Sequence, residues 1–349
     1  MENTITHTIA KIFVCLLLTS LAACTPATQI VLPTQGIDTV AVSVTPTLTL
    51  VPSPTSTWTS TPPLTPTVRP LVPDFKHIIM IVFENHEFDT VIGNRTMLEY
   101  NQYAQANTLL TQYYAITHPS LPNYLALFGG DTFKITTDCE NCYISASNLT
   151  DQIEASGRTW RAYFQDMPNP CFYSDTAIYV QKHNPFMYFD SIRLDATRCD
   201  RSVVPFPQLE TDLADGSLPD FVYIMPNSCV STDDIYSNPD CNLTLADGWL
   251  SGVMGMLLDY LSPRAASEPY LIILTWDEGQ GSHSCCGMPA QAGGRVPTVL
   301  ISPMAKSGFQ DGTPYTHYSL LKTIETAWGL SLLGHAADAN NVLITAPWK

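Results

Sequence analysis

The sequence is poor in charged residues, and basic residues are the scarcest of them. Only 14% of its 349 residues are charged, and 16 Lys and Arg stand against 32 Asp and Glu, which gives a formal net charge of −16. Such a surface repels nucleic acids and anionic lipids, so the composition argues against proteins that bind them by general electrostatic attraction. An anionic ligand would need local positive charge, which a bound cation supplies even in an acidic protein.

Apolar runs long enough to span a membrane are also missing. The run 12–18, preceded by Lys11, is shorter than the roughly 20 residues that a transmembrane helix needs. A short apolar run between a basic residue and small residues is typical of a signal peptide, which we expect over 1–23. Residues 21–24, Leu-Ala-Ala-Cys, resemble the lipobox of bacterial lipoproteins, which implies lipidation of Cys24. An ordinary secretory signal with an incidental cysteine is the alternative.

The ten cysteines can be divided by position. Cys15 lies in the expected signal peptide and Cys24 is the expected lipid acceptor. The remaining eight are Cys139, Cys142, Cys171, Cys199, Cys229, Cys241, Cys285 and Cys286. An even number in an exported chain predicts disulfides, whose connectivity the spacing leaves open. A zinc site on the Cys139 and Cys142 pair is the alternative, but no second pair with a matching histidine pattern follows in the sequence.

Composition divides the chain after the expected signal peptide. Residues 24–73 are rich in Thr, Pro, Ser and Val and carry almost no charge. A stretch of that kind cannot form a core, so we expect a disordered linker there. From about residue 74 apolar runs alternate with helical patterns as far as residue 349. We therefore expect one catalytic domain over 74–349.

Secondary structure is predicted by the periodicity of the apolar residues. Continuous β-rich apolar runs, typical of strands buried on both faces, occupy 77–83, 221–225, 270–276 and 296–301. Three helical stripes of apolar residues lie between these runs. The first consists of Leu149 and Ile153 and ends at Gly157, and the second consists of Leu250, Val253, Leu257 and Leu261. The third consists of Leu321, Ile324 and Trp328 and is closed by Gly329. Strands that alternate with helices predict an α/β fold with a mainly parallel sheet.

Acidic and amide side chains follow two of these predicted strands. Glu84 and Asn85 come after the first run, and Asp277 and Glu278 come after the run 270–276. Ligands of open α/β sheets bind outside the carboxyl ends of the strands. These side chains offer only oxygen ligands, which favours a hard divalent cation such as Mg, Mn or Ca over a structural zinc. One such pair alone is also common in helix caps and exposed loops, but two pairs at equivalent strand ends favour a metal site.

A candidate nucleophile lies between these two pairs. Residues 117–124 read Thr-His-Pro-Ser-Leu-Pro-Asn-Tyr, and Pro122 suits the first turn of a helix that begins near Ser120. The positive field of a helix N-terminus, together with a metal, lowers the pKa of a serine hydroxyl and prepares it for attack on phosphorus. A plain serine N-cap is the alternative.

The order of these motifs resembles that of a known family. The run 78–89, with Gly93 after it, is similar to the opening signature of the phosphoesterase family of bacterial acid phosphatases and phospholipases C. Later blocks of that family are matched in order by 118–124, 182–185, 218–220, 225–227, 277–279, 296–298 and 316–319. The resemblance covers about 76–332. It implies a three-layer α/β sandwich of the alkaline phosphatase type and a hydrolase of phosphoric ester bonds.

The resemblance also implies roles for individual residues. Ser120 matches the nucleophile of the related superfamily, and Asn123 matches a donor to the phosphate. The implied metal ligands are Glu84, Asn85, Asp277 and Glu278. The implied catalytic histidines are His183 and His317, and the remaining substrate-binding candidates are His118, Lys182 and Asn227.

One block departs from the family pattern. Relatives often show Asp-x-His-Asp after Pro-Asn, whereas residues 231–234 here read Ser-Thr-Asp-Asp. If the missing histidine donates a proton to the leaving oxygen, that proton must come from another histidine in this chain. The candidates are His183, His317 and His118, with His283 as a further one.

We therefore expect an extracytoplasmic phosphomonoesterase of the acid phosphatase type, held at the bacterial cell membrane by its lipid and dependent on a divalent metal. Its substrate would be a phosphorylated small molecule or lipid. A phospholipase C-like phosphodiesterase or a phosphoinositide phosphatase is the nearest alternative. Phospholipases C of this family usually carry further C-terminal domains, so a chain that ends at Lys349 favours the monoesterase. A catalytically inactive lipoprotein that binds a ligand is the alternative from another class.

Overall fold

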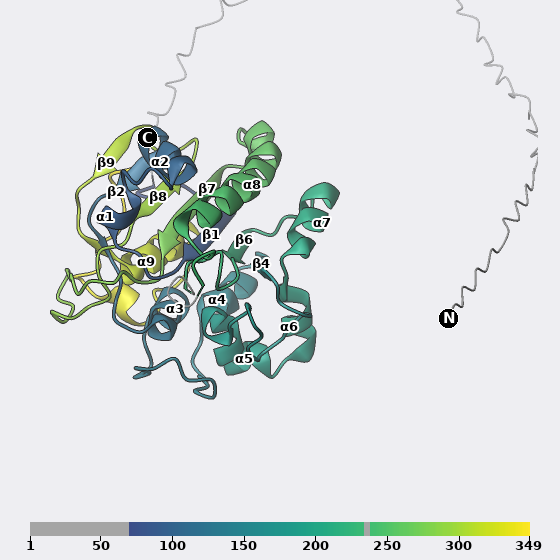
Figure 1. Cartoon of the computed structure of the whole chain (residues 1–349). Helices are drawn as coiled ribbons and strands as arrows, with labels where there is room; N and C mark the ends of the chain where they lie inside the picture. Colours follow the sequence, from purple (N-terminus) through teal and green to yellow (C-terminus); the bar gives the residue numbers. More distant parts are fainter. Residues whose placement is uncertain (1–69, 234–237) are drawn as a thin grey trace, which may run out of the picture. The chain divides into compact units, whose positions relative to one another are not determined.

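The computed structural model describes residues 70–233 and 238–349 (Figure 1). The expected signal peptide, the expected lipid acceptor Cys24 and all but the last residues of the expected linker lie outside these ranges. The hydrophobic core already includes Val72, so packing begins just before the predicted start of the domain at residue 74. Among the residues described, no helix has the length and apolar character required to cross a membrane.

An eight-stranded sheet lies at the centre of the described region. Its strands in chain order are β1 (His77–Phe83), β2 (Thr108–Leu110), β4 (Trp160–Phe164), β5 (Val203–Pro205), β6 (Phe221–Met225), β7 (Tyr270–Trp276), β8 (Thr298–Ile301) and β9 (Phe309–Asp311). Their spatial order is β5-β4-β6-β1-β7-β8-β2-β9, and within this sheet β8 runs antiparallel to both of its neighbours. A separate two-stranded sheet pairs β3 (Tyr113–Tyr114) with β10 (Tyr315–Thr316).

Three of the four predicted strands are confirmed with their bounds. The runs 77–83, 221–225 and 270–276 form β1, β6 and β7, which lie side by side and parallel at the centre of the sheet. The run 296–301 forms a shorter strand that begins at Thr298, because Pro297 cannot donate a ladder hydrogen bond. That strand is antiparallel, so the sheet is mainly and not wholly parallel.

Helices connect the strands and account for the predicted stripes. The α-helices are α1 (Phe88–Val91), α2 (Leu98–Ala106), α3 (Ser120–Gly129), α4 (Leu149–Ala155), α5 (Asp190–Arg193), α6 (Ala196–Ser202), α7 (Pro207–Asp215), α8 (Leu243–Leu261) and α9 (His317–Ala327). Short 3₁₀ helices are η1 (Gln181–His183), η2 (Pro185–Tyr188), η3 (Ser262–Arg264) and η4 (Gly334–Ala337). The three predicted helical stripes are α4, α8 and α9. Gly157 and Gly329 follow α4 and α9 with φ of 83° and 65°, a conformation that glycine adopts without strain.

Helices cover both faces of the sheet. Successive side chains of a strand point to opposite faces, so the contacts of individual strand residues show which helix covers which face. Met80 of β1 is paired with Tyr223 of β6, so these two side chains share a face, whereas Phe83 lies three residues further on and faces the other side. Tyr223 packs against Phe128 of α3, with ring centroids 5.3 Å apart. Phe83 packs against Trp249 of α8 at 6.0 Å. The fold is therefore three-layered, with α3 and α8 on opposite faces, and the predicted α/β sandwich is confirmed.

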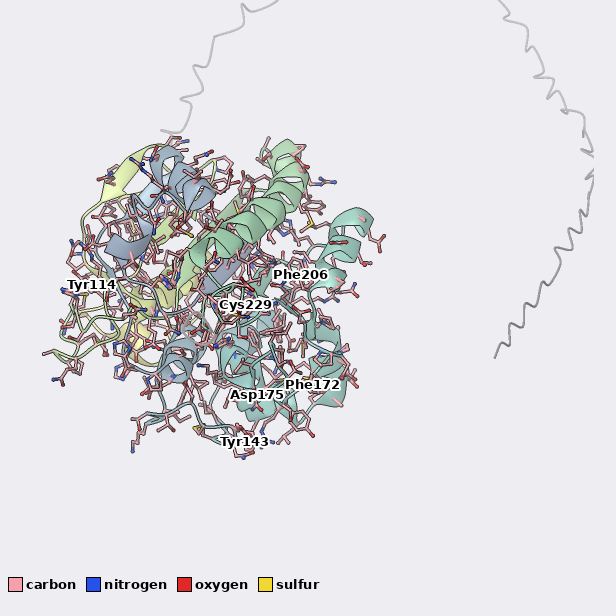
Figure 2. The ribbon with its side chains drawn as sticks, in the orientation of Figure 1. Tyr114, Tyr143, Phe172, Asp175, Phe206 and Cys229 are labelled. Carbon is pink, nitrogen blue, oxygen red and sulfur yellow. A yellow bond between two sulfur atoms is a disulfide. The ribbon has the colours of Figure 1, made fainter. Side chains whose placement is uncertain are left out.

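The eight cysteines of the described region form four disulfides. The pairs are Cys139–Cys142, Cys171–Cys199, Cys229–Cys241 and Cys285–Cys286. The side chains are drawn in Figure 2, where Cys229 is labelled. Because Cys139 and Cys142 bond to each other, neither thiolate is available for the alternative zinc site.

Thiol titration of the denatured, unreduced protein should therefore find almost no reactive thiol among residues 70–349. The bridges should differ in their contribution to stability, because a disulfide restricts the unfolded chain more when it closes a longer loop. Replacing both Cys171 and Cys199, 28 positions apart, with serine should lower the free energy of unfolding by on the order of 3 kcal/mol. The same change at the adjacent Cys285 and Cys286 is the matched control and should cost far less. Equal losses in urea unfolding would contradict this explanation.

A buried acid in α9 should make stability depend on pH. Glu325 is fully buried, its Oε1 accepts from Leu333 N at 2.9 Å, and its Oε2 has no hydrogen-bond partner among the described residues. Burial raises the pKa of Glu325 from 4.5 to about 8. Because the folded-state pKa lies above the unfolded one, its contribution to stability is complete below about pH 4 and is lost as the pH rises through 8.

Replacing Glu325 with glutamine should remove this loss. We expect the free energy of unfolding of the variant, relative to the wild type, to be higher at pH 8 than at pH 5 by an amount on the order of a few kcal/mol. Urea unfolding at a series of pH values measures this difference. Glu210→Gln, at an exposed position of α7, makes the same chemical change and should show no such trend. A pH-independent difference for Glu325→Gln would rule out the explanation.

Candidate active site

The two predicted acidic pairs meet at one edge of the sheet. Strands β1 and β7 are parallel, with Phe83 paired with Trp276, so the residues that follow them are neighbours. Asn85 and Asp277 are 192 positions apart, and Asn85 N donates to Asp277 Oδ1 at 3.2 Å. Asn85 has a φ of 61°, in the left-handed region that asparagine tolerates better than most residues. The predicted convergence of these strand ends is therefore present in the structure.

Ser120 lies between two of the carboxylates. Its hydroxyl is 3.0 Å from Glu84 Oε2 and 3.1 Å from Glu278 Oε1, and the residue is almost completely buried. Helix α3 begins at Ser120, as predicted, but Pro119 occupies the N-cap position. The hydroxyl thus points toward carboxylates and not toward an amide of its own helix, so the alternative of a plain serine cap is wrong.

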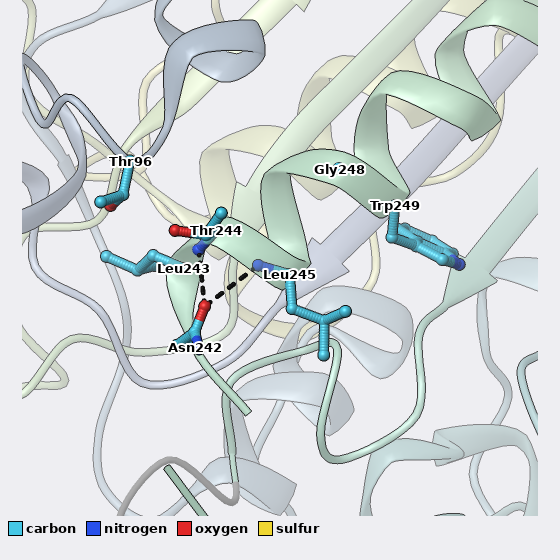
Figure 3. A pocket seen from close by; sticks show the side chains of 7 residues that line it. All are labelled: Thr96, Asn242, Leu243, Thr244, Leu245, Gly248 and Trp249. Carbon is cyan, nitrogen blue, oxygen red and sulfur yellow. Dashed lines mark hydrogen bonds between the residues drawn. The ribbon is translucent and has the colours of Figure 1, made fainter. Parts of the chain in front are cut away.

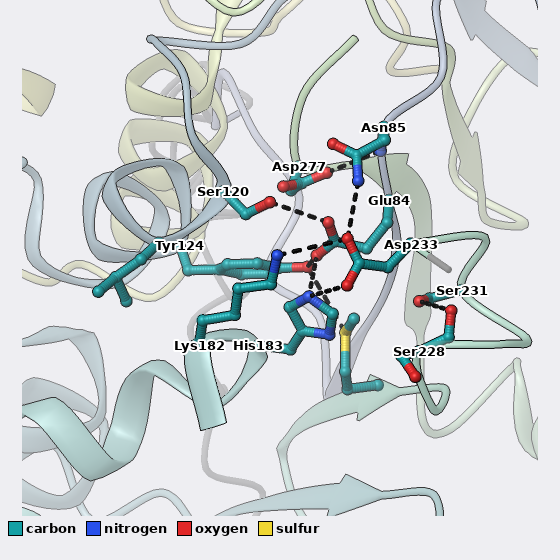
Figure 4. Close-up of polar contacts among 12 residues, drawn as sticks. Glu84, Asn85, Ser120, Tyr124, Lys182, His183, Ser228, Ser231, Asp233 and Asp277 are labelled. Atoms are coloured by element: carbon teal, nitrogen blue, oxygen red, sulfur yellow. Dashed lines mark hydrogen bonds and ion pairs between the residues drawn. The ribbon is translucent and has the colours of Figure 1, made fainter. Parts of the chain in front are cut away.

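His183 and Asp233 complete a group around Glu84 (Figure 4). His183 Nε2 lies 3.1 Å from Glu84 Oε1 and 3.6 Å from Asp233 Oδ2. Asn85 Nδ2 donates to Asp233 Oδ1 at 2.9 Å. One ligand atom each from Glu84, His183 and Asp233 lies within 4.8 Å of the others, which is close enough for one metal ion to contact all three.

The ionisation of this group is strongly perturbed. Burial and then the neighbouring carboxylates of Asp277 and Asp233 raise the pKa of Glu84 well above its usual value. Burial and an adjacent carboxylate do the same to the pKa of Asp277. Burial, aided by the positive charge of Lys182, lowers the pKa of His183 well below its usual value. The neutral form of His183 is therefore favoured, and a neutral imidazole suits a metal ligand better than the predicted proton donor.

The residues at this edge of the sheet fit a divalent cation. Asp277 Oδ2 and His183 Nε2 are buried without hydrogen-bond partners in the described part of the chain, and a metal would satisfy both atoms. A cation would also offset the repulsion between the buried carboxylates. The predicted oxygen-only ligand set needs correction, because His183 adds an imidazole nitrogen. A mixed nitrogen and oxygen set also suits transition metals such as zinc or manganese.

The carboxylate of Glu278 is shared between Ser120 and His118. Its Oε1 accepts from Ser120 and its Oε2 is hydrogen-bonded to His118 Nδ1. The other ring nitrogen of His118 lies 2.9 Å from Gly281 O. The hydrogen bond with Glu278, opposed by partial burial, raises the pKa of His118 to about 9. His118 therefore carries a proton at neutral pH, separated from Ser120 by one carboxylate.

Lys182 adds a second positive charge to this acidic site. Its Nζ lies 3.3 Å from both Asp138 Oδ2 and Asp233 Oδ1. Burial disfavours its charged form, but the carboxylates of Glu84, Asp233 and Asp138 outweigh burial and raise the pKa of Lys182. The ammonium group stays charged, and its predicted binding of substrate remains a prediction.

Both ring nitrogens of His317 are engaged by other groups of the chain. His317 is fully buried, with Nδ1 3.0 Å from the hydroxyl of Tyr113 and Nε2 2.6 Å from the carbonyl oxygen of Asp277. Burial lowers the pKa of His317 to about 4, so the ring is neutral at the pH of most cell compartments. The predicted catalytic role is corrected to that of a support for the backbone of Asp277.

Asn123 is also occupied by local hydrogen bonds. Its Oδ1 accepts from Ile116 N at 2.9 Å and from Thr117 N at 3.2 Å. Its Nδ2 donates to Thr117 O at 2.8 Å and to Pro119 O at 3.2 Å. Both amide hydrogens are thus engaged, so the prediction that Asn123 donates to phosphate is wrong for this structure. Asn123 instead holds the turn that leads into Ser120.

Two further predicted residues lie outside this cluster. Asn227 donates to Asp166 Oδ2 at 2.6 Å and accepts from Val230 N at 2.7 Å, which uses it to hold its own loop. The predicted binding of substrate by Asn227 is therefore not supported. His283 is exposed, on the loop that the Cys285–Cys286 disulfide constrains.

Two residues of the site, Tyr124 and Asp233, were not predicted from the sequence. Tyr124 is fully buried and its hydroxyl donates to Glu84 Oε1. Its position four residues after Ser120, on the same face of one helix turn, could have indicated this contact. Asp233 lies in the block where a family histidine was expected, and its carboxylate reaches the site through the hydrogen bond from Asn85. Asp234 lies outside the described residues.

A wide hollow of about 860 Å³ lies elsewhere, at the start of α8 (Figure 3). It is lined by Thr96 and by Asn242, Leu243, Thr244, Leu245, Gly248 and Trp249. None of these residues belongs to the cluster around Ser120. The size of this hollow therefore does not identify the place of chemistry, which the convergence of ionisable groups identifies better.

Curated relatives of this chain are phosphatases. The chain is 33% identical over 279 residues to an acid phosphatase of Aspergillus fumigatus, covering 77% of this chain and 58% of that protein. It is 32% identical to a phosphate-repressible acid phosphatase of Penicillium chrysogenum, covering 77% and 63%. It is 27% identical to a phosphatidylinositol-3-phosphatase of Mycobacterium tuberculosis, covering 81% and 87%. The chain thus spans about three fifths of the length of these fungal relatives.

A solved structure agrees on the fold. A protein of the alkaline phosphatase superfamily from Vibrio parahaemolyticus superposes with a TM-score of 0.52 at 11% identity, covering 80% of this chain and 72% of that one. This likeness confirms the predicted alkaline phosphatase-like architecture. The model of the phosphoesterase family matches residues 94–331. Motif order, relatives and family match agree, and this chain belongs to the phosphoesterase family.

Proposed function

We propose that the protein is an extracytoplasmic, metal-dependent phosphomonoesterase of the acid phosphatase type, with Ser120 as its nucleophile. The observation that carries the proposal is the position of the Ser120 hydroxyl at the start of α3, within 3.1 Å of two buried carboxylates. A nucleophile, an acceptor for its proton and a positive helix end are together there. The phosphatase relatives support the same reaction class.

Proton transfers can be assigned to residues of the site. Glu278 accepts the proton of Ser120 while Ser120 Oγ bonds to phosphorus. His118 keeps its Nδ1 contact with Glu278, gives up the contact of Nε2 with Gly281 O, and passes its Nε2 proton to the leaving alcohol oxygen. In the second step water attacks the phosphoserine, the neutral His118 takes the proton of water, and Ser120 regains its proton from Glu278. Protons balance over the two steps, and His118 supplies the acid function that the missing family histidine leaves open.

A bound divalent cation would supply positive charge for the phosphoryl oxygens and for the serine oxygen. Glu84, Asn85 and Asp277 would hold it, together with His183 and Asp233. Lys182 adds a fixed positive charge beside them. The helix end and Lys182 orient an incoming phosphate dianion, which the surrounding carboxylates alone would repel.

Release of phenol from an aryl phosphate, with and without a chelator, tests the proposal directly. We expect turnover that chelation abolishes and that added divalent ions restore. A matched aryl diester should react far more slowly. Chelator-resistant turnover would refute the metal requirement, faster diester cleavage would favour the phospholipase C-like alternative, and no turnover with any added metal would favour an inactive binding lipoprotein.

Phosphoinositides are the second candidate substrate class. The M. tuberculosis phosphatidylinositol-3-phosphatase is covered over 87% of its length, more than the fungal acid phosphatases. Short-chain phosphoinositides compared with small phosphate monoesters would decide between the two. A kcat/KM that is higher for small monoesters would reject this candidate.

Anchoring through Cys24 remains a proposal from the sequence alone, since Cys24 lies outside the described residues. The proposed position is at the bacterial cell membrane on its outer side. Lipid labelling of the expressed protein should disappear in Cys24→Ser and the protein should leave the membrane fraction. Unchanged labelling would exclude Cys24 as the acceptor.

A further inference from the structure

A carboxylate already occupies the N-terminal end of α3 beside Ser120. Asp138 Oδ1 accepts from Leu121 N at 3.0 Å. Leu121 follows Ser120 directly, and α3 continues for 10 residues, so this amide belongs to the positive end of a helix of substantial length. The donor next to the nucleophile is thus engaged with an anion of the chain itself.

The second oxygen of the same carboxylate faces a cation. Asp138 Oδ2 lies 3.3 Å from Lys182 Nζ. Asp138 therefore bridges a helix amide and an ammonium group, the two kinds of donor that proteins use to bind phosphoryl oxygens. A carboxylate and a phosphoryl group both present negatively charged oxygens that accept from the same donors, so one can occupy the place of the other.

Lys182 does not depend on Asp138 for a negatively charged partner. Asp233 Oδ1 is also 3.3 Å from Lys182 Nζ and stays as its partner when Asp138 leaves. The side chain of Asp138 is 28% exposed. It belongs to the connection between α3 and α4, directly before the Cys139–Cys142 disulfide, and apart from an isolated bridge at Ile144 this connection contains no regular structure. The carboxylate can thus turn toward solvent without disturbing the core.

We propose that Leu121 N–H and Lys182 Nζ form a subsite for a phosphoryl oxygen, and that the Asp138 carboxylate competes with substrate and product for it. The inference rests on the proposed function, because it takes the phosphate to lie beside Ser120. Binding of phosphate breaks the two contacts of Asp138 and makes equivalent ones. Asp138 therefore weakens phosphate binding and, by the same competition, speeds the release of inorganic phosphate as product.

Calorimetric titration of the full chain with inorganic phosphate, in buffer that contains a divalent cation, tests the competition. Asp138→Ala removes the competing group and should tighten phosphate binding on the order of tenfold, the scale of one charge-assisted contact. Asp138→Asn keeps an acceptor for Leu121 N–H but loses the charge opposite Lys182, and should give a smaller gain. Glu140→Gln removes a charge from an exposed position of the same loop and should leave the affinity unchanged.

Equal or weaker phosphate binding by both Asp138 variants, with melting temperatures like that of the wild type, would overturn the inference. Weaker binding would mean that Asp138 positions Lys182 and α3 for the substrate. Because calorimetry does not require turnover, the two proposals fail separately. A protein that lacks phosphatase activity but gains phosphate affinity in Asp138→Ala would refute only the proposed reaction, and an active enzyme without that gain would refute only the competition.

Discussion

Replacing Ser120 with alanine is expected to lower kcat by several powers of ten while the protein stays folded. The hydroxyl is the group that would bond to phosphorus, and it contacts the carboxylates of both Glu84 and Glu278. When nucleophile, base and cation act as one unit, loss of the nucleophile removes most of the rate. The residual turnover would come from bound water and electrostatic stabilisation of the transition state.

Ser319→Ala is the matched control for this change. Ser319 is also buried in the first turn of a helix, α9, but its hydroxyl has no hydrogen-bond partner among the described residues and lies outside the cluster. Its removal should leave kcat within a few-fold of the wild type. Acid quench during turnover should trap phosphate on the peptide that contains Ser120. Near-normal turnover of Ser120→Ala, or label on a histidine, would disprove the proposed mechanism.

Replacing Asp277 with alanine should remove metal and activity together. Asp277 Oδ1 accepts from Asn85 N, and its Oδ2 has no partner within the described chain, which leaves that oxygen for a cation. Loss of residues that merely support metal ligands costs 10- to 100-fold, so loss of a ligand should lower kcat/KM by at least about 100-fold. Metal content by mass spectrometry and turnover of an aryl phosphate should fall in parallel.

Thermal stability gives a second readout for Asp277. Metal that binds the folded state should stabilise the wild type, by about 2.7 kcal/mol at 100 times the Kd, and should not stabilise the variant. Without metal the variant should be at least as stable as the wild type, because one buried carboxylate that repels its neighbours has gone. Asp311→Asn removes another buried carboxylate, at the sheet edge on β9, and should keep its metal. An Asp277→Ala protein with full metal content would contradict the assignment.

The central sheet could be predicted because its signal is local. Strands β1, β6 and β7 are buried on both faces, so each appears in the sequence as an unbroken apolar run with its bounds visible. Strands β2, β5 and β9 are only three residues long, too short to produce a pattern distinct from that of a loop. The antiparallel direction of β8 likewise follows from its partners and not from its own residues.

The site could be predicted in part for the same reason. Glu84 and Asp277 follow recognisable strands, and parallel strands bring their carboxyl ends to one edge, so their meeting follows from the pattern. Ser120 could be placed at a helix start because Pro122 marks the first turn. Roles that depend on hydrogen-bond partners could not be read in this way. Asn123 fits a family block, yet its amide is used entirely by the turn before Ser120.

The sequence by itself determined the α/β fold, the two acidic pairs, the serine at the start of a helix and the even set of cysteines, because each is visible in residues that are adjacent or regularly spaced. Only the tertiary structure decided that His183 is neutral beside Glu84, that Asp233 enters the same cluster and that Asp138 reaches the amide of Leu121. Charge state and hydrogen bonding depend on burial and on partners far away in the chain, and spacing along the sequence does not record them.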